Sequence, residues 1–339
     1  MGRFRGKCVA LCNHHGQFRS VDALRPAGGR LRPPAGSLIV RTEPEPESLP
    51  AMKRHLPALA LLAAAALAPN ARAQAPGGAA NQAPLRCAVD GTFAPHAFPK
   101  LDGGVQGFQI DLFQEVARRM GRTITIDSAS FSGLIPALNA GRYDFLCAPT
   151  TVTPERAANL LFTEGYLWTE LQFGIRRGAP PIKSEEDLRG KSISVNKGTP
   201  YEQWVTRNAE RLNLTPLAFD SQADAVQAVL QGRAQANLSG NTVVKYSASQ
   251  TRGQYVADYV LPNTRMHWGT PFRQDSAAMR NQVEGVIECM KKDGTIARLS
   301  ERWFGAAPKE DDAERVSFPG FGPPGMPGYD ATPHEPRCG

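Results

Sequence analysis

The strongest constraint on the fold of this chain is an alternation of strand and helix patterns that occurs twice. In residues 85–148, short β-branched or apolar runs that read as strands alternate with runs whose apolar residues recur at helical spacing. A similar set follows in residues 174–238. Because such alternation is typical of parallel sheets covered by helices, the sequence predicts an α/β fold with two lobes, each a mostly parallel sheet flanked by helices.

The individual elements can be placed from the same patterns. Strands are expected at residues 85–90, 123–126, 143–148, 192–196, 217–219, 234–238 and 264–272. Helices are expected at residues 107–121, 133–140, 201–212, 223–231, 276–292 and 294–304. We expect the last two helices to pack on the first lobe, so that the chain crosses between the lobes twice.

Residues 52–73 have the pattern of a secretory signal peptide. Lys53 and Arg54 form a basic start, residues 56–67 are apolar, and a small-x-small cleavage pattern ends at Ala73. The apolar run is too short to span a membrane comfortably. No cysteine lies near the cleavage point, so we expect an exported, periplasmic protein without a lipid anchor.

The sequence also predicts how the rest of the chain divides. Residues 1–51 precede the signal, which indicates either a start codon assigned too far upstream, with Met52 as the initiator, or a disordered region. The expected parts of the mature chain are a linker (74–84), a first lobe (85–173 plus 265–305), a second lobe (174–264) and a Pro/Gly-rich tail (306–339).

The net charge of +7 does not indicate a nucleic-acid or membrane-surface partner. Residues 1–73 contain 11 Lys and Arg against 4 Asp and Glu, and the rest of the chain is balanced. Because the excess lies outside the expected globular body, the folded part has no net attraction to polyanions. We therefore expect no nucleic-acid partner.

Export would place the cysteines in an oxidising compartment, where disulfides form. Cys289 lies in an expected helix and Cys338 near the end of the chain, and we expect a disulfide between them that pins the tail to the body. Cys87 and Cys147 each lie in an expected buried strand, either paired or as free buried thiols. No cysteine spacing indicates a metal site.

The segment 131–156 contains a candidate anion clamp. It reads as a helix, a buried strand and a Thr-rich turn that opens a second helix, with Thr151 and Thr153 at the turn and Arg156 in the first helical turn. Helix N-termini attract anions, and a guanidinium adds a planar, bidentate donor. The alternative interpretation is an ordinary capped helix with a solvated arginine.

Several motifs resemble those of the family 3 solute-binding proteins of ABC importers. They are DGTFAPHAF (90–98), GFQIDLFQEVARRMG (107–121), FSGLIPALNAGRYD (131–144), TVTPER (151–156), EDLRGKSISVNKGT (186–199) and KKDGTIARLSERWFG (291–305). The resemblance covers residues 85–305. It implies the two-lobed periplasmic-binding-protein fold (type II), with two hinge crossings near residues 174 and 264–269.

The resemblance also implies a set of ligand-binding residues between the lobes. Arg156 and Thr151 match positions that grip a ligand's α-carboxylate, and Phe93 and Phe131 match aromatic walls. Asp90 matches a position that often reads the ligand's side chain. The implied second-lobe positions are Thr199, which follows Gly198 at a helix N-terminus and matches an anion contact, and Gly240.

Two departures from the family pattern concern this site. Gly240 stands where amino-acid binders have an Asp that takes the ligand's ammonium, and Pro149 stands where a backbone N–H meets the carboxylate. Loss of a buried charge partner costs several kcal/mol. Either Asp90 or Glu202 substitutes for the missing acid, or the ligand lacks an α-ammonium.

The resemblance implies a binding protein that takes an amino acid or related small carboxylate by hinge closure and delivers it to an ABC permease in the inner membrane. It implies a monomer without enzymatic activity, cofactor or metal. One alternative is a dehydratase of the cyclohexadienyl dehydratase type, which would need a general acid such as Glu202 or Glu164. A second is an accessory protein of a periplasmic quinoprotein dehydrogenase, with the tail as a partner surface.

Overall fold

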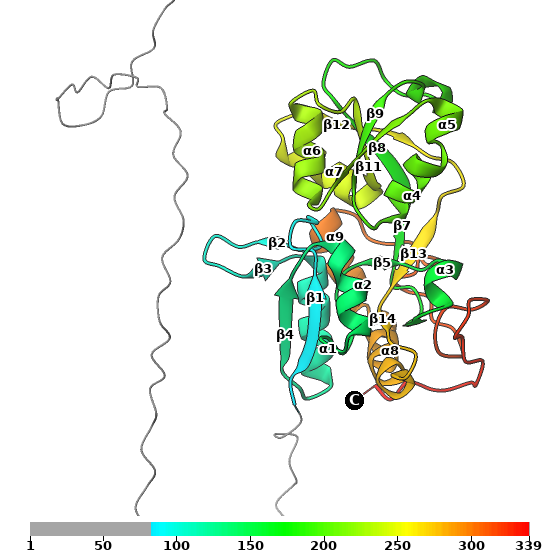
Figure 1. Ribbon diagram of the computed structural model, residues 1–339. Helices are drawn as coiled ribbons and strands as arrows, with labels where there is room; N and C mark the ends of the chain where they lie inside the picture. Colours follow the sequence, from blue (N-terminus) through cyan, green and yellow to red (C-terminus); the bar gives the residue numbers. More distant parts are fainter. Residues whose placement is uncertain (1–82, 339) are drawn as a thin grey trace, which may run out of the picture. The chain divides into compact units, whose positions relative to one another are not determined.

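The computed structural model describes residues 83–338. The predicted signal peptide, the residues before it and most of the predicted linker lie outside the described residues. Among the described helices, none combines the length and the apolar character that a membrane crossing requires. The described part of the chain forms two α/β lobes (Figure 1).

The first lobe is built from short sheets packed against helices. Strands β1 (Leu85–Val89) and β4 (Ile124–Ser128) pair in parallel. The antiparallel pairs are β5 (Thr150–Thr151) and β7 (Leu167–Thr169), both on β13 (Met266–Gly269), then β6 (Leu161–Phe162) with β14 (Pro271–Phe272), and β2 (Phe98–Pro99) with β3 (Val105–Gln106). The helices are α1 (Phe108–Arg119), α2 (Phe131–Asn139), α3 (Pro154–Ala157), α8 (Ala277–Lys292) and α9 (Thr295–Phe304).

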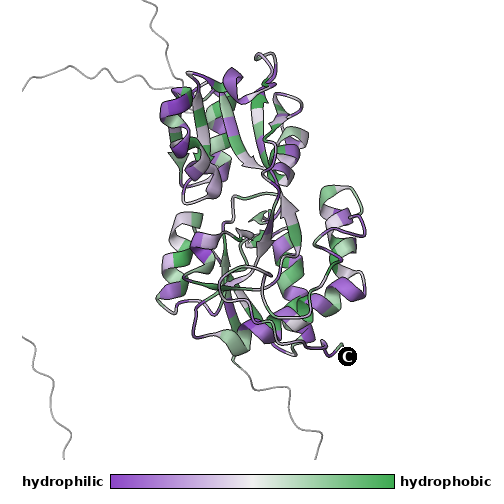
Figure 2. Cartoon of the chain, turned by 90° about the vertical axis from the view of Figure 1, so that its right-hand side faces the viewer, coloured by the Kyte–Doolittle hydropathy of each residue, from purple (hydrophilic) through white to green (hydrophobic). Residues whose placement is uncertain are grey.

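The second lobe is a five-stranded sheet with helices around it (Figure 1). In sheet order its strands are β10 (Thr215–Phe219), β9 (Ser192–Asn196), β11 (Ala236–Gly240), β8 (Leu171–Arg176) and β12 (Tyr255–Val260). Its helices are η1 (Glu185–Leu188), α4 (Pro200–Arg207), α5 (Ala209–Leu212), α6 (Gln222–Leu230) and α7 (Asn241–Gln250). Figure 2 shows apolar segments along these strands and mixed apolar and polar residues along the helices.

The sheets are mixed in direction, whereas the sequence predicted mostly parallel sheets. In the second lobe, β10, β9 and β11 run parallel, but β8 is antiparallel to both β11 and β12. Strands β8 and β12 carry the chain into and out of the lobe, so they run in opposite directions. The sheet of the second lobe starts at Leu171, three residues before the predicted lobe boundary at residue 174. The exact lobe boundaries stay a prediction.

Three predicted elements differ in the structure. The strand predicted at 264–272 is two strands, β13 and β14, which pair with different partners. Residues 143–148 form no regular strand. The Asp144 carboxylate accepts the Arg86 backbone N–H at 2.9 Å, which takes the place of a ladder bond. The helix predicted at 201–212 is two helices, because the backbone of Asn208 leaves the helical conformation between α4 and α5.

Both pairs of cysteines in the described residues form disulfides. Cys289 and Cys338 are bridged, as predicted, and Cys87 and Cys147, for which the sequence left both states open, are bridged as well. The tail beyond α9 contains no helix or strand ladder up to residue 338, and its one backbone bridge joins Phe321 and Asp330. The tail is therefore held to the first lobe covalently at its far end.

Candidate functional site

A cavity lies where the two lobes meet. Its free space is about 10 Å³, which is room for about one water molecule. From the first lobe it is lined by Asp90, Phe93, Phe131, Pro149, Thr151 and Arg156, and from the second by Asn196, Thr199, Pro200 and Tyr201. The structure thus brings together six of the eight predicted site residues.

Arg156 enters the cavity from the first turn of α3. Thr153 caps this helix by accepting the Arg156 backbone N–H, and Pro154 follows at the first helical position, so the local sequence fixes the start of the helix. The guanidinium donates from Nη1 to the Thr151 carbonyl oxygen at 2.9 Å and from Nη2 to the Gly198 carbonyl oxygen at 3.1 Å. It also lies 5.5 Å from the centre of the Phe131 ring.

No acidic residue in the described part of the chain neutralises the charge of Arg156. Within residues 83–338, no carboxylate lies within ion-pair distance of its guanidinium. Burial lowers the pKa of Arg156 to about 10, so the group stays charged at neutral pH. A positive charge whose only hydrogen-bond acceptors are carbonyl oxygens is suited to an anionic ligand.

Asp90 supplies a negative charge to the same cavity. It follows β1 and is 3% exposed. Its Oδ1 accepts the Thr92 backbone N–H at 2.9 Å and the Thr92 hydroxyl at 2.7 Å, and its Oδ2 accepts Nδ2 of Asn196 at 2.8 Å. All of these donors are neutral. The cavity therefore carries one positive and one negative group, each without an ionic partner in the described part of the chain.

The second-lobe wall is formed at the N-terminus of α4. Thr199 caps this helix by accepting the Glu202 backbone N–H at 3.3 Å. The Glu202 carboxylate accepts the Gly198 backbone N–H at 2.6 Å and does not line the cavity. Gly198 has φ +78°, and a Cβ there would lie 3.1 Å from Cα of Ser132 in the other lobe, so glycine suits both the turn and the close approach.

Gly240 does not line the cavity, which differs from the site that the resemblance implied. It ends β11, and a Cβ at this position would lie 2.9 Å from both the Tyr201 hydroxyl and Oγ1 of Thr169. No aspartate fits here without moving those groups. Gly198 is likewise not a lining residue, although its carbonyl oxygen accepts from Arg156.

Hydrogen bonds between the lobes hold the cavity closed. Besides the contacts of Arg156 and Asp90, the Gln222 backbone N–H donates to the Thr92 hydroxyl at 3.1 Å, and Nε2 of His96 lies 2.8 Å from Oγ1 of Thr242. His96 is fully buried, and burial lowers its pKa to about 3, so the imidazole is neutral at neutral pH.

Sequence reasoning missed Asn196, Pro200 and Tyr201. Asn196 stands at the carboxyl end of a parallel strand, where ligands of α/β folds commonly bind, and that rule would have identified it. No local signal marks Tyr201, whose pKa burial raises to about 12. Asn237 is buried inside the second lobe, where its Oδ1 accepts from Gln222 and Tyr255.

Comparison with known proteins places the chain in a family. Residues 85–306 match the sequence model of the bacterial extracellular solute-binding proteins, family 3. The chain belongs to this family. The match spans both lobes and ends at the start of the tail, so the tail lies outside the matched region.

Individual relatives are similar over the same region. The L-cystine-binding protein TcyJ of Escherichia coli (strain K12) is 27% identical over 66% of this chain and 83% of its own length. The putative ABC transporter arginine-binding protein 2 of the same organism is 25% identical over 65% of this chain and 90% of its own. Among solved structures, an ancestral arginine-binding protein bound to arginine has a TM-score of 0.63 at 30% identity, covering 66% of this chain and 99% of that one.

Another solved structure bears on the enzyme alternative. An ancestral amino-acid-binding protein described as a precursor of cyclohexadienyl dehydratase has a TM-score of 0.60 at 30% identity, and it covers 65% of this chain and 95% of its own. Like the three proteins above, it is named for the amino acids that it binds and not for a reaction.

Proposed function

We propose that this protein is the periplasmic solute-binding component of an ABC importer, and that it binds an amino acid or a related small carboxylate between its lobes. The observation that carries the proposal is the pair of opposite charges, Arg156 and Asp90, that line one cavity between the lobes. In this form the lobes leave room for about one water molecule between them, so a ligand of amino-acid size requires them to move apart and then close around it.

The two charges assign a role to each end of the ligand. A ligand carboxylate meets the guanidinium of Arg156, with the Thr151 hydroxyl and the N-terminus of α4 beside it. Asp90 meets a cationic group, because its present partners are neutral donors. Of the two acids that could replace the missing family aspartate, Asp90 lines the cavity and Glu202 does not. We therefore favour a zwitterionic ligand.

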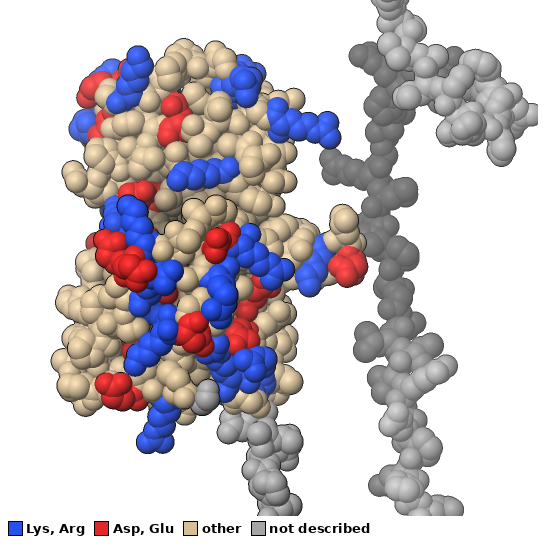
Figure 3. Space-filling model, turned by 180° about the vertical axis from the view of Figure 1, so that it is seen from behind, with Lys and Arg blue, Asp and Glu red and all other residues tan. Residues whose placement is uncertain are grey.

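Hinge closure would complete the binding step. The residues that line the cavity come from both lobes, so a ligand between them adds contacts only when the lobes are together. The closed form would then dock on the permease of the inner membrane. Figure 3 shows Lys and Arg interspersed with Asp and Glu on one face of the described residues, which agrees with a small-molecule ligand rather than a nucleic acid. We also propose that the protein acts as a monomer without a cofactor.

The cavity offers little support for the dehydratase alternative. That alternative needs a general acid beside the ligand. Glu202 is bonded to the Gly198 backbone N–H, and Glu164 is bonded to Lys291, and neither lines the cavity. Incubation of the purified protein with prephenate or arogenate, followed by product analysis, tests this alternative directly. No feature of the cavity favours the dehydrogenase-accessory alternative.

A thermal-shift screen of amino acids, dicarboxylates and aromatic acids tests the proposal, since a ligand raises the melting temperature by mass action. We expect a shift with a zwitterionic amino acid, confirmed by calorimetric titration. Asp90→Asn should weaken binding of that ligand at least about tenfold, and the exposed Asp224→Asn should leave it unchanged. If no small carboxylate binds, or if Asp90→Asn binds as tightly as the native protein, the charge assignment is wrong.

A further inference from the structure

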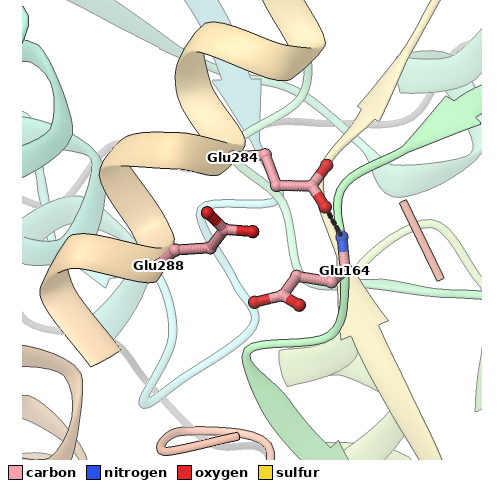
Figure 4. A group of neighbouring side chains, drawn as sticks. All are labelled: Glu164, Glu284 and Glu288. Carbon is pink, nitrogen blue, oxygen red and sulfur yellow. Dashed lines mark hydrogen bonds between the residues drawn. The ribbon is translucent and has the colours of Figure 1, made fainter. Parts of the chain in front are cut away.

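Three carboxylates converge inside the first lobe, away from the residues that line the cleft. Glu164 follows β6, and Glu284 and Glu288 lie one turn apart on α8. Glu164 and Glu284 are 0% exposed and Glu288 is 1% exposed. One oxygen from each residue lies within 4.8 Å of the others, and Figure 4 shows the three carboxylates facing a common space.

The basic groups nearby neutralise this cluster only in part. The ammonium of Lys291 donates to Oε1 of Glu164 at 2.6 Å, and its other donors go to the carbonyl oxygens of Gly165 and Val316. Arg280 has its Nε 3.7 Å from Oε2 of Glu284, beyond hydrogen-bond distance, and donates from Nη1 to the carbonyl oxygens of Phe162 and Gly328. Neither cation pairs with Glu288.

Two carboxylate oxygens of the cluster have no hydrogen-bond partner. They are Oε2 of Glu284 and Oε1 of Glu288, both buried. The other oxygen of Glu288 lies 2.8 Å from Nε2 of His334. Buried carboxylate oxygens without donors are costly, so these two oxygens are free to accept a further positive group.

We propose that Glu164, Glu284 and Glu288 form a binding site for a hard divalent cation, with Ca²⁺ as the preferred ion. An all-oxygen donor set favours Ca²⁺ or Mg²⁺ over softer metals. The three carboxylates are buried and lie within 4.8 Å of one another, and Ca²⁺ suits such a site better because Mg²⁺ gives up its waters reluctantly and usually keeps several of them. An ion at this place would give the unpartnered oxygens of Glu284 and Glu288 a positive partner.

The same carboxylates hold the C-terminal tail, which gives the ion a structural role. Oε2 of Glu164 accepts the Phe318 backbone N–H at 2.8 Å, and Oε1 of Glu284 accepts the Gly322 backbone N–H at 2.6 Å. His334 of the tail bonds Glu288. A cation that fixes these three side chains also fixes the acceptors of the tail, so ion binding and tail docking stabilise each other.

The test uses the full mature chain, freed of metal with EDTA and dialysed, and then titrated with CaCl₂ or MgCl₂. We expect calorimetry to report one Ca²⁺ per chain with weaker Mg²⁺ binding. The melting temperature should rise by about 5 °C or more when Ca²⁺ exceeds its Kd a hundredfold. Limited proteolysis should cut the tail more slowly with Ca²⁺ than with EDTA.

Matched variants separate this site from general ion effects. Glu288→Gln keeps the size of the side chain and should abolish both the Ca²⁺ titration heat and the thermal shift, whereas Glu301→Gln, an exposed residue on α9, should keep both. Glu284→Gln is the second cluster variant, should Glu288→Gln fail to fold. The proposal is overturned if no divalent ion binds the native chain, or if either folded cluster variant binds Ca²⁺ with native affinity.

Discussion

Replacing His96 with glutamine should reduce the acid sensitivity of the protein's stability. His96 is 0% exposed, and the ring centres of Trp268, Phe304 and Phe93 lie 4.7 Å, 5.3 Å and 5.7 Å from its own. These apolar neighbours disfavour the imidazolium, and burial lowers the pKa of His96 from 6.5 to about 3. Its Nε2 can still pair with the Thr242 hydroxyl as a neutral group.

The size of the effect follows from the two pKa values. Unfolding returns the imidazole to a pKa near 6.5, so below that pH the unfolded chain binds a proton that the folded chain does not. The contribution of neutral His96 is therefore fully present above pH 6.5 and is lost as the pH falls toward 3. At pH 5 the unfolded state is favoured about 30-fold by this group, which corresponds to about 2 kcal/mol.

Urea unfolding at pH 7.5 and pH 5 measures this contribution. The difference in unfolding free energy between the native protein and His96→Gln should change by about 2 kcal/mol between the two pH values. Other titrating groups cancel in this difference. Thr242→Val is the matched control, and it should keep the native pH dependence because burial, not the hydroxyl, lowers the pKa. An identical difference at both pH values would refute the reasoning.

Two further substitutions test the cleft and the tail. Gly240→Asp should weaken ligand binding in calorimetry, because the new Cβ would lie 2.9 Å from the Tyr201 hydroxyl and from Oγ1 of Thr169 in the closed form. Tighter binding of an α-amino acid would contradict this and show that the closed cleft has room for the acid. Cys338→Ser opens a disulfide with a sequence separation of 49 residues and should lower the unfolding free energy by about 4 kcal/mol in chemical denaturation; an unchanged value would mean that the tail does not need the bridge.

Elements with a strong local pattern could be predicted from the sequence. Strand β9 was predicted with its observed bounds, and helices α8 and α9 within one residue at each end, because their apolar residues repeat regularly and their ends are marked by Ser276, Gly294 and Gly305. The sequence also predicted a disulfide between Cys289 and Cys338, and the structure confirmed it.

The missed elements depend on contacts between distant segments. Strands β8 and β12 pair with each other across about 80 residues, and α7 has a mixed surface whose apolar side is defined only by its packing on β12 and β8. Residues 143–148 look like a strand from their apolar run, and their backbone does donate to β1, from Asp144 to Arg86 and from Cys147 to Ala88, but the bonds do not form a regular ladder. Tertiary contacts decide these cases, and a local pattern does not contain them.

The candidate site was predicted where one segment or a family motif contributes the residues. Arg156, Thr151, Phe93 and Phe131 do line one cavity. Which acid faces the ligand could not be read from the sequence, since that depends on the closure of two lobes. The cluster of buried glutamates could not be predicted either, because Glu164 and Glu284 are separated by 120 residues and no local sequence pattern indicates that they meet.

The binding affinity of Arg156→Ala for the ligand found by the thermal-shift screen is the most direct test of the central claim. Loss of two charge-assisted hydrogen bonds to a carboxylate should weaken binding about 100-fold or more in calorimetric titration. The exposed Arg142→Ala should bind as the native protein does. Native affinity in Arg156→Ala would contradict the assignment of the cleft as the ligand site.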